Sequence, residues 1–261
     1  MESILNFSPD QYFNYFLIML RVGGLFVTAP ILSSDTVPRQ LRAGLALFVG
    51  LILFMALPLK PIYADWTPTA FFLIAIRETM IGLLLGVVPR LLFAAIDFAG
   101  TVIGFQMGLS LANVVDPQTR IQTSLIASFD SLVATLFFVV IDGHHIFFEV
   151  MATSYEQIPL GGFTFEANKI DFLLRLTANM ILLGLQLGAP LIVALLMANV
   201  ILGFMARAMP QMNIFIVGIP VTILIGFVII AFGMPYLTGA IHKSFNTLGS
   251  QVLELIGIMA H

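Results

Sequence analysis

The chain has 261 residues, of which 59% are hydrophobic and only 10% are charged. Soluble globular proteins carry about 25% charged residues, so this composition and a mean hydropathy of +1.04 exclude an ordinary soluble fold. The net charge of −3 argues against a nucleic-acid binder, which needs a concentrated basic face. There is no cysteine, which excludes disulfides and thiolate chemistry.

Long apolar runs follow one another along the chain. They cover about residues 11–32, 43–59, 69–96, 123–141, 172–205 and 212–235. Such continuous runs predict membrane helices, because a barrel would show short alternating segments. No linker divides the chain, so we predict one all-α, polytopic membrane domain over residues 1–261.

Charges and prolines interrupt these apolar runs. Each charge costs about 2.5–3.5 kcal/mol at a bilayer centre, and each internal proline removes a backbone donor. We therefore predict kinked helices and helical hairpins that are shielded largely by protein. The interrupting residues are Arg21, Arg77, Glu78, Asp97 and Arg207, with Pro30, Pro89, Pro190, Pro210 and Pro220.

The C-terminal stretch predicts an amphipathic helix at about 241–260. Its apolar residues recur at steps of four and three, which places them on one helical face. This helix could lie on the membrane surface or dock on a partner, and the pattern favours neither. The apolar positions are Ile241, Phe245, Leu248, Val252, Leu255 and Met259.

Small residues spaced by four, at Gly100, Gly104, Gly108 and Ala112, form a row. One interpretation is close helix packing, since small residues let two backbones approach. The other is an irregular, cavity-lining segment that acts as a gate element, because glycine weakens a helix.

A polar break separates the last two apolar runs and contains Arg207, Pro210, Gln211 and Asn213. It is either an ordinary loop or a constriction that contacts other subunits, and its position does not decide.

Asp142, His144, His145 and Glu149 have spacing that could suit a metal. We expect a polar helix end there and no metal. No catalytic or nucleotide-binding motif occurs, which predicts a protein that is not an enzyme and has no cofactor.

Several landmarks together resemble the FliR family, in the expected order over most of the chain. They are Arg21-Val22-Gly23-Gly24 leading to Ala29-Pro30, Val37-Pro38, Arg42-Ala43-Gly44-Leu45-Ala46, Gly104-Phe105-Gln106-Met107-Gly108-Leu109-Ser110 leading to Asp116-Pro117, Asp142-Gly143-His144, Arg207-Ala208-Met209-Pro210-Gln211-Met212-Asn213 and Gly218-Ile219-Pro220.

The resemblance implies a subunit of the flagellar type III export gate. Such a subunit assembles with FliP and FliQ into a closed, spiral complex, the pore for unfolded flagellar proteins, with FlhB as a further partner. The resemblance also implies a place in the bacterial inner membrane at the flagellar basal body, with much of the subunit lifted out of the bilayer plane.

The resemblance further implies a plug loop at about 104–122. The family often has aromatic residues in this loop, whereas Leu111 and Val114 here are smaller, and Phe105 and Met107 could compensate. The plug or gate residues implied are Phe105, Met107, Leu109, Leu111, Val114, Asp116 and Pro117.

Two alternatives stay open from the sequence. One is the same gate in a virulence type III secretion system. The other is a stand-alone secondary transporter with Arg21, Glu78 and Arg207 near a midplane site, although such transporters show internal repeats that this chain lacks.

Overall fold

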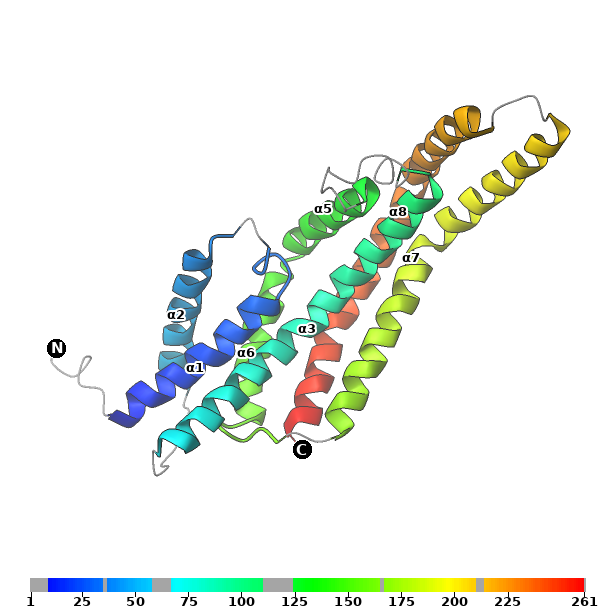
Figure 1. Cartoon of the computed structure of the whole chain (residues 1–261). Helices are drawn as coiled ribbons and strands as arrows, with labels where there is room; N and C mark the ends of the chain where they lie inside the picture. Colours follow the sequence, from blue (N-terminus) through cyan, green and yellow to red (C-terminus); the bar gives the residue numbers. More distant parts are fainter. Residues whose placement is uncertain are drawn as a thin grey trace. The chain divides into compact units, whose positions relative to one another are not determined.

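The computed structural model describes residues 9–34, 37–57, 67–109, 124–164, 167–209 and 214–260. Within these ranges the regular elements are α-helices, and no strand occurs among them (Figure 1). The all-α prediction is therefore confirmed. The helices are α1 (Pro9–Thr28), α2 (Arg39–Ala56), α3 (Pro68–Gln106), α5 (Leu125–Val140), α6 (His144–Gln157), α7 (Ala167–Ala208) and α8 (Ile214–Ala260).

Among the described residues, four helices are long and apolar enough to cross a membrane: α2, α3, α7 and α8. Helices α5 and α6 together qualify as a fifth span, bent by 66° between them. These helices confirm a polytopic membrane protein. Helix α1 is not among the candidate spans.

The three longest helices continue past their prolines. Pro89 lies inside α3, Pro190 inside α7, and Pro220 and Pro235 inside α8. Proline is tolerated inside membrane helices because neighbouring groups satisfy the freed backbone carbonyls. The same helices also extend beyond the apolar runs that the sequence delimits, α3 to Gln106, α7 to Ala208 and α8 to Ala260.

Two compact units make up the chain. The first unit contains residues 1–91, 142–176 and 247–261. The second unit contains residues 92–141 and 177–246. Helices α3, α7 and α8 each contribute residues to both units.

In the first unit, α1 packs against α2, α3 and α6. The hydroxyl of Tyr15 donates to the carbonyl of Leu47 on α2 over 3.0 Å. The hydroxyl of Tyr155 on α6 donates to the carbonyl of Ile18 over 3.1 Å. Helix α1 thus has three helical neighbours within its own unit.

The apolar stripe predicted for residues 241–260 is buried within the chain. It belongs to α8 and is not a separate helix. Each of its six side chains is only 1% exposed. The prediction that this stripe meets the membrane surface or a partner is therefore wrong, because the chain itself covers it.

Candidate functional site: the end of helix α3 and a buried ion pair

Helix α3 ends in a glycine cap within the second unit. Gly108 has a left-handed backbone (φ 81°). Its N–H donates to the carbonyl of Phe105, and the N–H of Leu109 donates to the carbonyl of Gly104. This pair of bonds is a Schellman motif, which favours glycine because a Cβ disfavours positive φ. Gly108 therefore ends the helix, and the row of small residues does not continue through it as one helical face.

The two earlier glycines of the row bring α5 close to α3. A Cβ on Gly100 would lie 2.6 Å from the Cα of Ala127, and one on Gly104 would overlap the hydroxyl of Ser124. Such distances leave no room for a larger residue. Gly100 and Gly104 thus pack helices inside this chain, while Ala112 lies outside the described residues.

Met107 fixes the end of α3 to α7 and α8. Its side chain is fully buried and lies against Gly226. The hydroxyl of Thr222 donates to the carbonyl of Met107 over 3.1 Å. The amide of Asn199 donates to the carbonyl of Gln106 over 3.4 Å. Two of the last carbonyls of the helix therefore have side-chain partners.

An apolar cluster surrounds this anchor. Its buried members come from α3, α5 and α7, together with Met107 at the end of α3, and partly buried isoleucines of α8 pack against it. The buried residues are Ile103, Met107, Ile126, Leu191 and Leu195. Leu109 also packs against this cluster.

The remaining gate residues differ in their placement. Phe105 is 71% exposed, although it lies only two positions before buried Met107. The other predicted residues, Leu111, Val114, Asp116 and Pro117, lie outside the described residues. The structure therefore places the start of the predicted plug at a fixed helix end.

The polar break after α7 is described only in part. Arg207 is exposed in the last turn of α7, where a cation interacts favourably with the helix dipole. Pro210, Gln211 and Asn213 lie outside the described residues.

Asp142, His144 and His145 lie together at the start of α6. One ligand atom from each falls within 4.8 Å of the others, and all three are exposed. The carbonyl of Asp142 accepts the N–H of His145 over 2.9 Å. Asp142 has a positive φ of 55°, which asparagine and aspartate tolerate better than most residues. These polar residues therefore lie at the start of α6, where the sequence predicts a polar helix end.

A buried ion pair lies in the first unit. The Nε of Arg21 on α1 is 2.7 Å from the Oε2 of Glu78 on α3, and both side chains are 0% exposed. Sequence reasoning noted both charges but did not pair them. Two opposite charges inside apolar segments can predict an ion pair, because buried charges are normally paired.

The remaining polar atoms of the pair bind the end of α6 and the turn after it. Arg21 donates to the carbonyls of Ser154 and Ile158 over 3.1 and 3.2 Å. The guanidinium also lies 4.2 Å from the centre of the Tyr155 ring. Glu78 accepts the N–H of Gly161 over 2.7 Å. This network ties three helices and a turn together.

Comparison with known proteins identifies the family. The family model described as bacterial export proteins, family 1, matches residues 12–248. A flagellar biosynthetic protein FliR of Bacillus subtilis (strain 168) is 30% identical, covering 99% of each chain. A FliR of Escherichia coli (strain K12) is 33% identical, covering 93% of this chain and 92% of the relative. A FliR of Aquifex aeolicus (strain VF5) is 29% identical, covering 92% of each. The chain therefore belongs to the FliR family of bacterial export proteins.

Proposed function

We propose that this chain is a gate subunit of the flagellar type III export apparatus. In this proposal it is not an enzyme, and it builds with FliP and FliQ a closed pore for unfolded flagellar proteins. The observation that carries the proposal is similarity over nearly the full length to proteins named flagellar biosynthetic protein FliR. FlhB is a further proposed partner, and the proposed location is the inner membrane at the basal body.

The exposed apolar surface supports assembly with other membrane components. In the candidate spans of α7 and α8, only 28% and 17% of the most apolar window is buried within the chain. Apolar surface on this scale faces lipid or other subunits. Large exposed residues on these helices include Leu182, Val193, Ile201, Phe204, Leu224 and Phe232.

Gating would use the end of α3 as a fixed support. The carbonyls of Gln106 and Met107 accept bonds from Asn199 of α7 and Thr222 of α8, and these bonds hold the helix end that precedes the proposed plug segment. In this proposal the segment provides an apolar constriction, which excludes water and ions by dewetting. In this proposal, an exported protein shifts the plug from a closed to an open state, because it makes different contacts with the two states.

Co-extraction tests the assembly part of the proposal. The chain is co-expressed with FliP and FliQ candidates from the same genome, extracted in mild detergent and analysed by native mass spectrometry. We expect one large, discrete species that contains all three proteins. If the extracted chain is instead stable alone, with no partner bound in any preparation, the gate proposal fails. A stand-alone transporter then becomes the better hypothesis.

Ion leakage tests the plug. Leu111 and Val114 are both replaced by serine in the assembled complex, which is reconstituted into vesicles loaded with a pH-sensitive dye. We expect faster proton leakage than in the wild-type complex, because polar side chains favour a wetted constriction. Replacing exposed Ile216 by serine on α8 provides a matched apolar-to-polar control. Equal leakage in the plug variant, the control and the wild type would refute an apolar seal at Leu111 and Val114.

A further inference from the structure

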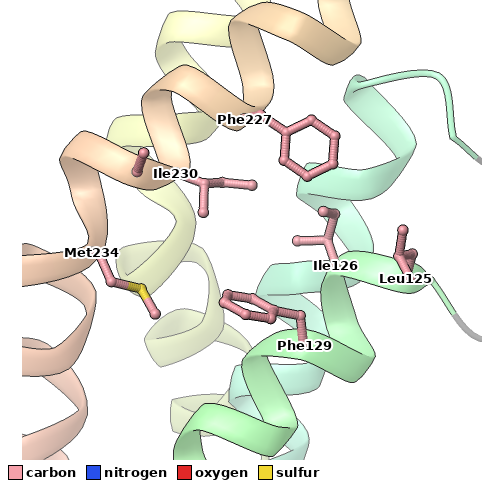
Figure 2. Close-up of a pocket in the computed structure, with 7 residues that line it drawn as sticks. Leu125, Ile126, Phe129, Phe227, Ile230 and Met234 are labelled. Atoms are coloured by element: carbon pink, nitrogen blue, oxygen red, sulfur yellow. The ribbon is translucent and has the colours of Figure 1, made fainter.

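An apolar pocket opens between α5 and α8 in the second unit. Its volume is about 510 Å³, which lies within the usual range for small-molecule sites. Figure 2 shows side chains from both helices around the space, with Phe129 and Phe227 on opposite sides of it. The lining residues are Leu125, Ile126, Phe129, Phe227, Ile230, Ala231 and Met234.

We propose that this pocket binds an acyl chain of a membrane lipid. All seven lining residues are apolar. An occupant therefore finds no hydrogen-bond partner among their side chains, and any polar group placed there would be desolvated without compensation. A hydrocarbon chain needs no hydrogen-bond partner, and each methylene group that it buries contributes about 0.8 kcal/mol to binding.

The geometry of the two helices explains why a pocket forms at this place. Phe138 of α5 contacts Phe245 of α8 with ring centroids 5.3 Å apart, and Phe137 contacts His242 at 5.7 Å. Toward the start of α5, the same two helices frame the open pocket. The aromatic contacts thus lie at one end of the seam between α5 and α8, and the pocket lies at the other.

The surroundings favour lipid over a peptide. Leu125, Phe129 and Phe227 are exposed, so the pocket reaches the surface of the chain. Four of the seven lining residues come from α8, and only 17% of the most apolar window of that span is buried within the chain. An extended peptide would leave backbone N–H and C=O groups unpaired there, and a helix about 10–12 Å across is too wide for a pocket of this size.

Photo-crosslinking tests the proposal. The full chain, with any co-extracted partners, is placed in nanodiscs that contain a phosphatidylglycerol with a diazirine near the end of one acyl chain. After illumination, lipid adducts are mapped by peptide mass spectrometry. We expect adducts concentrated on the peptides around Phe129 and Met234. Ala231→Trp, which fills the pocket, is expected to reduce them several-fold.

Val228→Trp is the matched control, because Val228 is an exposed neighbour on α8 that does not line the pocket. It is expected to keep the adducts. If Ala231→Trp fails to give a monodisperse protein, the smaller Ala231→Leu replaces it. Adducts spread evenly over the exposed apolar residues would overturn the proposal. So would adducts that Ala231→Trp leaves unchanged, or crosslinks from the pocket to a partner protein in place of lipid.

Discussion

Replacing Glu78 by alanine is expected to destabilise the first unit by about 3–5 kcal/mol, because it leaves Arg21 charged and buried without its carboxylate. Both side chains are 0% exposed, so bulk solvent does not reach the pair. The same change also removes the acceptor for the N–H of Gly161. We expect a large drop in the thermal unfolding midpoint of the purified chain in detergent, followed by fluorescence.

A double replacement separates the effect of the unpaired charge from that of lost packing. Replacing both Arg21 and Glu78 by methionine removes the two charges together and keeps apolar volume, so it is expected to cost less than Glu78→Ala alone. Arg77→Ala is the control, since Arg77 is exposed and its guanidinium donates to the carbonyl of Gly161. A midpoint that falls as far in the control as in Glu78→Ala would argue against the buried pair as the source of the effect.

Gly82→Ala is expected to destabilise the packing of α1 against α3 strongly. A Cβ at this position would overlap the backbone carbonyl oxygen of Arg21, and it would lie 3.0 Å from the backbone nitrogen of Leu25. Backbone atoms cannot move aside as a flexible side chain can, so the two helices must separate. Overpacking of this kind costs about 1–3 kcal/mol, and occasionally more.

Gly203→Ala supplies a control with the opposite expected sign. Gly203 lies in α7, and a Cβ there would meet nothing within 4 Å. Alanine at such a helical position gains up to about 1 kcal/mol over glycine. Thermal midpoints of the two variants, measured side by side in one detergent, therefore separate close packing from helix propensity. The assignment of Gly82 to a close α1–α3 contact fails if both substitutions raise the midpoint.

The sequence predicted the type of secondary structure better than it predicted the lengths of the helices. Continuous apolar runs indicated membrane helices, and the described residues are indeed helical. The prolines at 89, 190, 220 and 235 do not end their helices, and α3, α7 and α8 are also longer than the apolar runs that the sequence delimits. Periodicity also found the apolar face of 241–260, but a face alone does not tell whether membrane, partner or the chain itself covers it.

The sequence predicted only those parts of the candidate site that depend on residues close together in the chain. Spacing by four found Gly100 and Gly104, and the structure places backbone atoms of Ala127 close to the first and the side chain of Ser124 close to the second. It could not reveal that Gly108 caps the helix, because glycine suits both roles. The partners Arg21 and Glu78 lie 57 residues apart, and the acceptors on Ser154 and Ile158 lie still further along the chain. Tertiary packing alone brings them together.

The order of synthesis gives the buried network a consequence for biogenesis. Arg21 leaves the ribosome long before Glu78, and the carbonyl of Ile158 that completes its bonding is made later again. The guanidinium lacks its carboxylate until Glu78 is made and lacks these backbone acceptors until Ile158 is made. An unpaired arginine opposes insertion by about 2.5–3.5 kcal/mol at the bilayer centre. We therefore expect helix α1 to stay at the membrane–water interface, or bound to an insertion factor, while the next hundred and more residues are translated. Arg21 is among the first residues to be made, but its set of partners is complete only after Ile158 has been made.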